Sequence, residues 1–511
     1  MELFHKQLGF DRGHPFVKTN ADEEPFLEEY FVPPPFFQAV LGDPVNPSAA
    51  VVLAPRGAGK SAQRRRLEIW CEKNGVLAVT YDRFEFSANQ KISDVSLTYH
   101  LRNIITRFLV AYLSFLQEKV DSLDKLSKEE RRYLSMFVTT YLGDLTSTSL
   151  HEILRELKGI PDRLKELWQK NVGVLEGVVN AVLKNYGLEA IDLPDLPQEQ
   201  KKLSESYKHQ LIVLCELARK IGLSAVYVLI DKVDETEKTG NNSDLSYRLV
   251  RPLLQDLDLL SLKGIGFKFF LWDAVQEMFR KDARPDRVPQ FQINWTIPQL
   301  REALSKRMQA FSGGKVKAFS DVVDDSVKFD PDLVISILAN GSPRNMIRMC
   351  ESIVAAQAEV DPGATKISSE AIDQGARRFC EQVVVEQYGA EIVKDLQRVG
   401  RELFTINFLS NDVFKTTHEN TSRNKVTAWT RCGVVRQIGE VSTSEAKRPM
   451  NFYCVVDPAM VRAIHAGVSI EKLLSDRWIP CTHCTHNNLM DIGLFPDKND
   501  PVCCKCGRAL V

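Results

Sequence analysis

The sequence lacks an excess of either charge and has no long hydrophobic run. Its 511 residues carry 66 Lys and Arg against 67 Asp and Glu, a net charge of −1 at pH 7. A neutral chain has no global attraction for nucleic acid or an anionic membrane, so any surface that binds a polyanion has to be local. No apolar segment reaches the ~18–20 residues that span a bilayer. The N-terminus MELFHKQLGFDRGHPF also lacks the apolar core of a signal peptide. We therefore expect a cytoplasmic protein with no membrane partner.

Cysteine is scarce over most of the chain and crowded near its end. Six of the eleven cysteines are scattered singly, and five fall within residues 481–506. Isolated cysteines are typical of buried, reduced thiols in an intracellular protein. The distribution predicts one cysteine-based site near the C-terminus.

The segment VVLAPRGAGKS (51–61) places a glycine-rich turn between a short apolar strand and a helix. Two glycines in the turn allow backbone N–H groups to approach phosphate oxygens, because a side chain there would block the approach. The lysine would reach the β- and γ-phosphates, and the serine hydroxyl would bind Mg²⁺. We expect the arginine run 64–66 to be solvated charge on the outer face of the helix. The predicted nucleotide-binding residues are Ala54, Pro55, Arg56, Gly57, Ala58, Gly59, Lys60 and Ser61.

A second motif, VYVLIDKVDET (226–236), supplies the acidic residues that a phosphate site needs. Mostly apolar residues carry Asp231 to the carboxyl end of a buried strand, where it would hold Mg²⁺ through water. A carboxylate three or four residues later would orient the attacking water, and we assign this role to Glu235. Asp234 either shares the catalytic role or caps a helix.

Four further residues have two interpretations each. Asp273 ends another strand candidate, FKFFLWD, and either faces the γ-phosphate or caps the next helix. Arg284 and Arg287 lie in a proline-bounded loop and either act in trans on the nucleotide of a neighbouring subunit or are solvated charges. Arg344 follows Gly and Pro in NGSPRNMIRMC, in the first turn of a helix. It either senses the γ-phosphate or lies on the surface.

With these motifs the chain resembles AAA+/STAND-type P-loop ATPases. APRGAGKS resembles the Walker A motif of initiator-type AAA+ ATPases of the origin-recognition family and of NACHT- and KAP-like ATPases of bacterial defence genes. VLIDKVDE is closer to the NACHT/KAP style, INWTIPQLREALSKRM resembles the initiators, and GSPRNMI resembles the lid's sensor arginine or the STAND GxP motif. The sensor arginine that NACHT proteins tend to carry is replaced by Asp273. The resemblance covers residues 25–90 and 205–380, and it implies ATP rather than GTP.

The segment 386–470 has the pattern of a winged helix, with helices at 392–404 and from 421 and a strand hairpin that ends at 451–457. Such a domain contacts DNA in initiators and clamps the nucleotide or a protein in STAND ATPases. Six basic residues against two acids give it a local charge of +4 that would neutralise phosphates. The residues are Arg423, Lys425, Arg431, Arg436, Lys447 and Arg448 against Glu440 and Glu445.

The last 36 residues contain two Cys-x-x-Cys pairs, Cys481 with Cys484 and Cys503 with Cys506. Two such pairs at this separation are typical of a tetrahedral Zn²⁺ site with four thiolate ligands, and a site without an open position is structural. A mixed set that draws on Cys504, His483 or His486 is the alternative. A zinc ribbon binds nucleic acid or protein, and the pattern is compatible with both.

The expected fold is an α/β P-loop NTPase core with a large helical insertion, a helical lid, a winged-helix domain and a small zinc ribbon. Residues 1–48, rich in Phe and Pro, would be an extended arm with one short helix, packed on the following domain. The resemblance implies an ATP-binding and ATP-hydrolysing switch of bacterial anti-phage defence that acts through the winged helix and the zinc ribbon. Its implied partners are further copies of the chain and either DNA or a separate effector protein. The alternatives are a DNA-binding initiator or transposition-type ATPase and a nucleotide-binding scaffold that hydrolyses nothing. The predicted segments are the arm 1–48, the core 49–310 with its insertion at about 93–219, the lid 311–385, the winged helix 386–470 and the ribbon 476–511.

Overall fold

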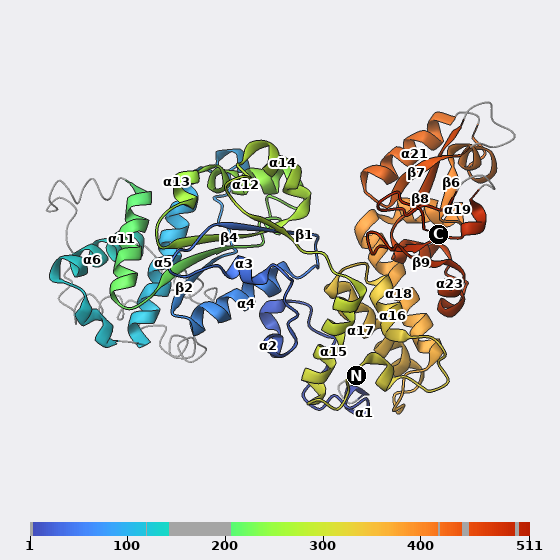
Figure 1. Cartoon of the computed structure of the whole chain (residues 1–511), viewed down its shortest axis with the longest axis horizontal. Coiled ribbons are helices and arrows are strands. Elements are labelled where there is room, and N and C mark those ends of the chain that lie inside the picture. Colours follow the sequence, from blue (N-terminus) through green and yellow to red (C-terminus); the bar gives the residue numbers. More distant parts are fainter. Residues whose placement is uncertain are drawn as a thin grey trace. The chain divides into compact units, whose positions relative to one another are not determined.

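The computed structural model describes residues 4–118, 120–142, 206–416, 419–441, 449–495 and 500–510. The chain forms two compact units (Figure 1). The sheet unit is Pro33–Ile293, and the C-terminal unit combines Met1–Val32 with Asn294–Val511. Much of the expected helical insertion, and the hairpin residues Glu445, Lys447 and Arg448, lie outside the described residues.

The sheet unit is built on five parallel strands, and the first four are almost entirely buried. Continuous runs of β-branched and aromatic residues suit parallel strands that are covered on both faces. The strand order is β2-β3-β4-β1-β5, so that β4 lies between the glycine-loop strand β1 and the acidic strand β3. Three of them, the strands before the glycine-rich turn, before Asp231 and before Asp273, confirm the strands expected from the sequence. The strands are β1 (Ala50–Ala54), β2 (Val76–Tyr81), β3 (Ala225–Ile230), β4 (Ile265–Trp272) and β5 (Gln290–Gln292).

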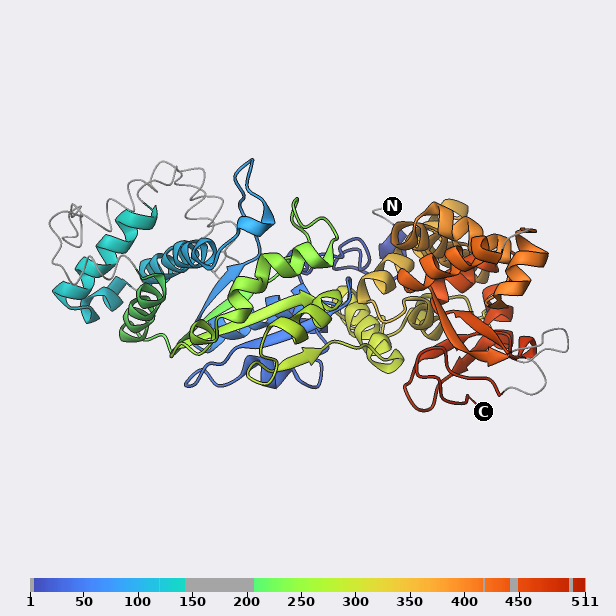
Figure 2. The same ribbon diagram turned by 90° about the horizontal axis from the view of Figure 1, so that it is seen from above.

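Helices cover both faces of this sheet (Figure 1). Helices α3 and α4 lie on one side, and α12, α13 and α14 lie on the other. The described part of the insertion, α5, α6 and α11, gathers beside β2 and β3 (Figure 2), and its apolar side chains join the core of the sheet. This described part of the insertion is therefore an extension of the core. The bounds are α3 (Phe37–Leu41), α4 (Lys60–Lys73), α5 (Leu97–Glu118), α6 (Lys128–Leu142), α11 (Tyr207–Lys220), α12 (Ser243–Gln255), α13 (Leu257–Leu260) and α14 (Gln276–Asp282).

From Asn294 onward, the C-terminal unit continues with helices whose N-termini are capped by nearby side chains. Thr296 and Gln299 form a capping box at α15, and Ser342 caps α17 in front of Pro343. The first two of these helices are α15 (Ile297–Ser312) and α16 (Pro331–Leu338), and they are followed by α17 (Pro343–Val360) and α18 (Ser369–Tyr388). Helix α15 belongs to this unit, so the sheet unit ends at Ile293 and not at residue 310.

The N-terminal arm differs from the expectation. Residues up to Val32 pack within the C-terminal unit, and the arm contains α1 (Phe4–Gln7) and α2 (Leu27–Tyr30), with only 33–48 in the sheet unit. The reason is Arg307 on α15, a buried residue whose guanidinium pairs with Glu24 at 2.6 Å. It also donates to the carbonyls of Pro15 and Lys18 and to the hydroxyl of Tyr30.

The segment after α18 forms a three-stranded antiparallel sheet in the order β6-β8-β7. The expected hairpin is confirmed, since β7 pairs with β8. The helix expected at 392–404 ends earlier, because Gly400 takes a left-handed conformation with φ 69° and closes α19. The elements are α19 (Ala390–Val399), β6 (Leu403–Thr405), α20 (Ile406–Phe408), α21 (Glu419–Arg431), β7 (Val435–Val441) and β8 (Met450–Val455).

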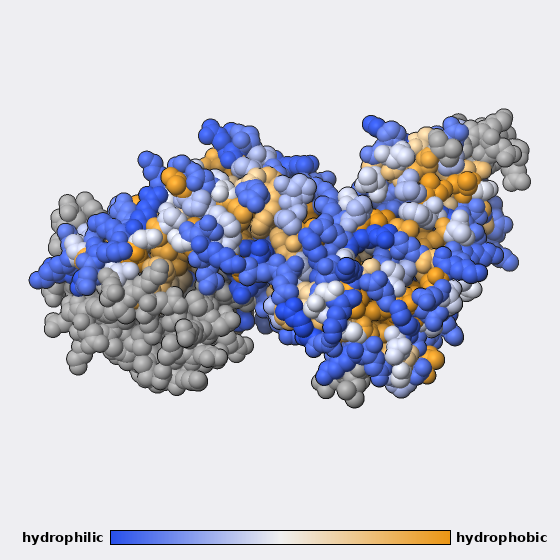
Figure 3. All heavy atoms as spheres, turned by 60° about the horizontal axis from the view of Figure 1, so that its bottom comes forward, coloured by the Kyte–Doolittle hydropathy of each residue, from blue (hydrophilic) through white to orange (hydrophobic). Residues whose placement is uncertain are grey.

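The chain then continues into α22 (Pro458–Ile464), α23 (Ile470–Arg477), β9 (Trp478–Pro480) and β10 (Asn487–Leu489). Hydrophilic residues dominate the faces of both units seen in Figure 3, with hydrophobic residues in smaller groups between them. Among the described helices, none combines the length and the apolar character that crossing a membrane requires.

Candidate functional site

The glycine-rich turn leads from β1 into α4, as the motif predicts. Gly57 and Gly59 have left-handed φ values of 76° and 93°, which glycine adopts without strain. Gly59 is also the N-cap residue of α4 and offers no side chain to the first N–H groups of the helix. Unsatisfied N–H groups at a helix N-terminus favour an anion, so the backbone fits a phosphate group.

Lys60 interacts electrostatically with four carboxylates. Its Nζ donates to the carbonyls of Ala54 and Pro55 at 3.3 and 3.4 Å. Burial lowers the pKa of Lys60, and the neighbouring charges that oppose this shift are Asp234, Asp231, Asp273 and Glu235. The structure thus brings together the lysine and all the acidic residues that the sequence assigns to the site.

Asp231 directly follows the last residue of β3, and it is 1% exposed. Its Oδ1 accepts a hydrogen bond from the Lys232 N–H at 2.9 Å, and its Oδ2 accepts one from Arg64 Nε at 2.9 Å. Each carboxylate oxygen has a second lone pair, so Asp231 retains the capacity to bind water around a metal ion. Together with the Ser61 hydroxyl on α4, it offers the hard oxygen ligands that Mg²⁺ prefers.

The expectation that Arg64 is solvated surface charge is wrong. Its side chain is completely buried and pairs with Glu68 one turn later on α4 and with Asp231, with Asp82 at 4.0 Å. Lys232 closes the cluster at 3.3 Å from Asp82. A buried arginine requires charged or polar partners, because its charge cannot be neutralised by deprotonation.

Asp82, Glu68 and Lys232 were not singled out from the sequence. The signal for Asp82 was present, since it directly follows β2 as Asp231 directly follows β3, and these parallel strands are neighbours in register. Glu68 stands four residues after Arg64, which places both on one face of α4. The sequence does not indicate that this face of α4 lies against the residues that follow β2 and β3.

Asp234 is buried and does not cap a helix. Helix α12 begins nine residues later, and its N-cap is Asn242. The Asp234 carboxylate instead accepts a hydrogen bond from Arg56 Nε at 3.0 Å. Glu235, the proposed general base, is exposed beside it. The Asp234 carboxylate is thus paired with Arg56, and the catalytic role of Glu235 stays a prediction.

Asp273 follows β4 and begins a short 3₁₀ turn, Asp273–Val275, as its first residue rather than its cap. Burial raises its pKa, and the charge of Lys60 opposes this shift. The two loop arginines are exposed, and both lie near Asp286, Arg284 at 2.9 Å and Arg287 at 3.9 Å. An action in trans stays a prediction for Arg284 and Arg287.

No family model matches this chain, and no curated protein matches it. Two solved structures from Aeropyrum pernix are similar to it. The first is the ORC1 protein in complex with DNA, which is 13% identical, with 90% of this chain and 98% of that chain covered and a TM-score of 0.34. The second is the ORC2 protein in ADPNP–ADP complexes, 10% identical, with coverages of 89% and 99% and a TM-score of 0.38. At such TM-scores the likeness decides nothing about this chain, and the site rests on its own geometry.

Arg344 is an exposed residue of the first turn of α17, as expected. It belongs to the C-terminal unit, whereas Lys60 and the four carboxylates belong to the sheet unit. A role of Arg344 as a nucleotide sensor stays a prediction.

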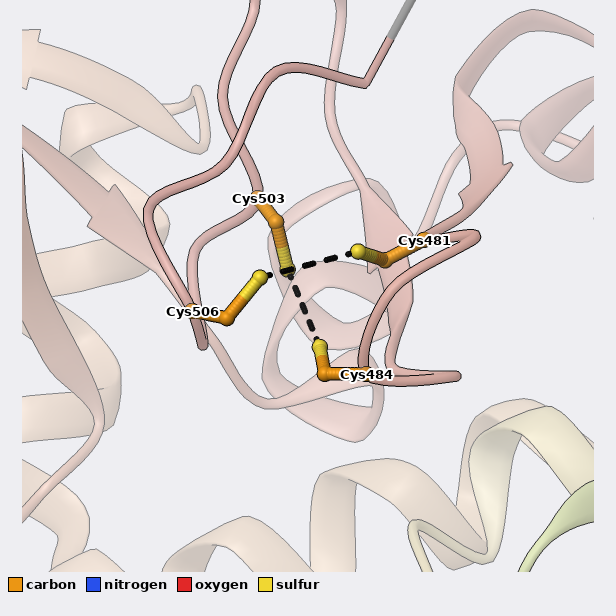
Figure 4. A group of neighbouring side chains, drawn as sticks. All are labelled: Cys481, Cys484, Cys503 and Cys506. Atoms are coloured by element: carbon orange, nitrogen blue, oxygen red, sulfur yellow. Dashed lines mark hydrogen bonds between the residues drawn. The ribbon is translucent and has the colours of Figure 1, made fainter.

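The second candidate site is the four-cysteine cluster. The sulfur atoms of Cys481, Cys484, Cys503 and Cys506 all lie within 4.8 Å of one another and point toward a common centre (Figure 4). Cys481 and Cys506 are 3.7 Å apart, and Cys484 and Cys503 are 3.6 Å apart. A tetrahedron with zinc–sulfur bonds of about 2.3 Å has edges of about 3.8 Å. The sulfur positions therefore fit Zn²⁺.

The two cysteine pairs sit in equivalent turns. Thr485 and Gly507, each directly after the second cysteine, have left-handed φ values of 59° and 74°. Their N–H groups donate to the carbonyls of Cys481 and Cys503 at 3.0 and 2.9 Å. Each turn thus closes at its first cysteine, which brings the paired sulfur atoms to one side of the turn.

Among the described residues, the metal-ligand group contains none of the alternative ligands. Cys504 is buried in a small apolar cluster with Leu403, Phe452 and Met490. His483 lies 3.0 Å from Arg508 through its Nδ1. The cluster supports the four-cysteine assignment, in which Cys504 is a packing residue.

The basic residues expected to face DNA are partly engaged within the protein. Lys425 pairs with Asp395 on α19. Arg436 on β7 donates to the carbonyls of Cys504 and Lys505 and so fastens the cysteine-rich segment to the hairpin. Of the described basic residues on α21, Arg423 and Arg431 are exposed. Of the four described residues of this patch, two are thus engaged within the C-terminal unit.

Proposed function

We propose that this chain binds ATP with Mg²⁺ and hydrolyses it, and that it acts as a nucleotide-dependent switch of the AAA+/STAND type. The glycine-rich turn between β1 and α4 carries the proposal, because its backbone fits a phosphate group and Lys60 beside it interacts electrostatically with four carboxylates. Phosphoryl transfer needs positioned charge and little covalent chemistry from the protein, and this arrangement offers both signs of charge.

Each residue has a defined role in this proposal. Lys60 and the N-terminus of α4 would bind the β- and γ-phosphates, and Ser61 and Asp231 would hold the metal ion. When bound, Mg²⁺ neutralises charge on the β- and γ-phosphate oxygens. Glu235 would take the proton of the attacking water, and Asp273 would lie toward the γ-phosphate.

The experiment compares three variants with the wild-type protein by nucleotide binding and by phosphate release. Lys60→Ala is expected to lose ATP binding, whereas Glu235→Gln is expected to bind ATP and to lose turnover by about 10²–10⁴-fold. Arg248→Gln, an exposed arginine paired with Asp244 on α12, is the control and should behave as wild type. Equal turnover in wild type and Glu235→Gln would refute the catalytic assignment and favour a scaffold that only binds nucleotide.

A DNA-binding role is the second candidate, favoured by the outer face of α21. Apart from Ala428, the exposed residues of this helix are polar or basic, and they recur at helical spacing. Such a face suits phosphates and base edges, because arginine and asparagine donate to both. The winged-helix assignment of this segment belongs to the same proposal. The face consists of Asn420, Arg423, Asn424, Thr427, Ala428, Thr430 and Arg431.

The DNA role is tested by the salt dependence of duplex binding. Replacing Arg423 and Arg431 by Ala should lower the slope of log affinity against log salt by about 0.9 for each lost phosphate contact. Arg377→Ala on α18, an exposed arginine paired with Glu381, is the control. Absence of binding at low salt in the presence of ATP would exclude this role and leave a protein effector as the partner.

A further inference from the structure

Arg56 is the one charged side chain within the glycine-rich turn besides Lys60. Its contacts indicate a role other than phosphate binding alone. Its Nε and Nη2 donate to Oδ2 and to the main-chain carbonyl of Asp234, both at 3.0 Å. Its Nη1 donates to the side-chain oxygen of Asn241. The guanidinium carbon lies 4.6 Å from the centre of the Trp272 ring. All three nitrogens and one face of the group are thus engaged.

These contacts span the acidic loop, which we define as residues 232–241 between β3 and α12. The loop begins and ends on non-glycine residues in the left-handed region, Lys232 at φ 57° and Asn241 at φ 66°. Such conformations are disfavoured for residues other than glycine and persist only where surrounding contacts impose them. Arg56 supplies such contacts, since it binds Asn241 at one end of the loop and Asp234 two residues after Lys232.

We propose that Arg56 is a positioning residue for Glu235. The guanidinium holds both the side chain and the carbonyl of Asp234, and the next peptide unit carries Glu235. The proposal rests on the proposed ATPase function for its catalytic consequence, and it assigns Arg56 to orientation of the base rather than to nucleotide affinity. Asp234 then acts as the anchor through which Arg56 works.

The same contact couples the phosphate-binding turn to the acidic loop. Arg56 immediately precedes Gly57, whose backbone would close around phosphate. A displacement of the turn therefore moves the group that holds Asp234. Trp272, at the end of β4, lies against the same guanidinium and offers a spectroscopic view of this movement.

The test uses the full chain and the variants Arg56→Gln, Arg56→Lys, Asp234→Asn and the double variant Arg56→Gln/Asp234→Asn. For Arg56→Gln we expect the ATP dissociation constant to change by less than about threefold and kcat to fall by about 10- to 100-fold, because a small misplacement of a catalytic group has effects of this size. Asp234→Asn should give a similar loss, and the double variant should be no slower than either single variant. Arg56→Lys should recover part of the turnover.

A second measurement does not depend on catalysis. Hydrogen exchange in the nucleotide-free protein should become faster over residues 232–241 in Arg56→Gln, with β1, β3 and β4 as protected as in wild type. The control is Arg248→Gln, which should change neither exchange nor turnover. Tryptophan fluorescence should respond to ATP in wild type and lose most of this response in Trp272→Phe.

Two results would overturn the inference. Loss of ATP affinity in Arg56→Gln at unchanged kcat would make Arg56 a phosphate ligand, and additive losses in the double variant would separate Arg56 from Asp234. If the wild-type chain hydrolyses no ATP, the proposed function fails. In that case the exchange measurement alone decides whether Arg56 holds the acidic loop, and unchanged exchange in Arg56→Gln refutes it.

Discussion

Arg64 Nε lies 2.9 Å from Oδ2 of Asp231, and both side chains are buried beneath the proposed phosphate site. One arginine on the helix that follows the glycine-rich turn therefore fixes the carboxylate at the end of a strand two positions away in the sheet, since β4 separates β1 from β3. The proposed metal ligand is part of a buried ion cluster before any ligand binds.

Arg64→Met should strongly destabilise the sheet unit. The substitution leaves Glu68 and Asp231 buried without their main cation, and removing one partner of a buried pair costs about 3–5 kcal/mol. The measurement is urea unfolding followed by hydrogen exchange of the β3 amides, which report on the sheet unit. Arg65→Gln, its partly exposed neighbour paired with Glu68 at 3.1 Å, should lose at most about 1 kcal/mol. Equal losses in the two variants would contradict the prediction.

The buried Lys268 should make the folding stability of the protein change with pH in the alkaline range. It is fully buried in β4, its Nζ has no hydrogen-bond partner among the described residues, and it lies 5.0 Å from the Tyr227 ring. Burial lowers its pKa to about 8 from the usual 10.5. The unfolded chain therefore binds this proton more tightly than the folded protein does. The loss of folding stability caused by the buried charge is complete below about pH 8 and disappears as the pH rises to about 10.5.

Lys268→Met should accordingly stabilise the protein at pH 7 by up to ~3 kcal/mol, since one pKa unit corresponds to about 1.4 kcal/mol. The advantage over wild type should shrink steadily between pH 8 and pH 10.5. Unfolding of both proteins across this range checks the prediction. An advantage that stays constant with pH would show that the lysine charge is not its cause.

The zinc site should distinguish the ligands from their neighbour. Cys484→Ser removes one thiolate of the four-sulfur cluster and should reduce bound zinc to well below one equivalent. Cys504→Ala removes a buried packing residue and should keep about one equivalent of zinc, with a stability loss of about 1 kcal/mol. Metal analysis of the two purified variants, with wild type alongside, provides the comparison. Zinc loss from Cys504→Ala would favour the mixed ligand set.

Gly507→Ala should weaken the second cysteine turn through the backbone alone. A Cβ at Gly507 would meet no atom within 4 Å, but φ is 74°, where an alanine costs about 1–2 kcal/mol. Since zinc binding and folding of such a segment are linked, zinc affinity should fall about tenfold in a competition titration. Gly467→Ala is the matched control, because it also has open space around its Cβ and lacks a positive φ. Equal zinc affinity in the two variants would exclude a backbone effect.

The sequence was most informative where structure is decided within a few residues. The glycine-rich turn with Gly57 and Gly59 and the gathering of the two cysteine pairs form as expected, because turn chemistry and short spacing are local. Strands β1, β3 and β4 were found for a similar reason. A buried parallel strand is a continuous apolar run, and its carboxyl end is marked by the polar residue that follows.

The sequence was least informative about where long polar side chains end. Arg64 and Arg56 find their acidic partners 167 and 178 residues away, and Arg307 binds the arm 292 residues before it. A run of arginines on a helix gives the same local pattern whether it faces solvent or a strand end. The engagement of Lys425 and Arg436 within the C-terminal unit was hidden for the same reason.

By itself, then, the sequence determined the chemistry on offer: a glycine-rich turn with its lysine, carboxylates that follow buried strands, and two cysteine pairs at zinc spacing. These depend on residue type and short spacing, which local backbone physics preserves. Only the tertiary structure decided which charged side chains are buried against a partner within the protein and which are exposed to solvent. It buried Arg64 against Asp231, anchored Asp234 on Arg56 and left Glu235 exposed, because burying a charge is favourable only where distant segments bring it a partner.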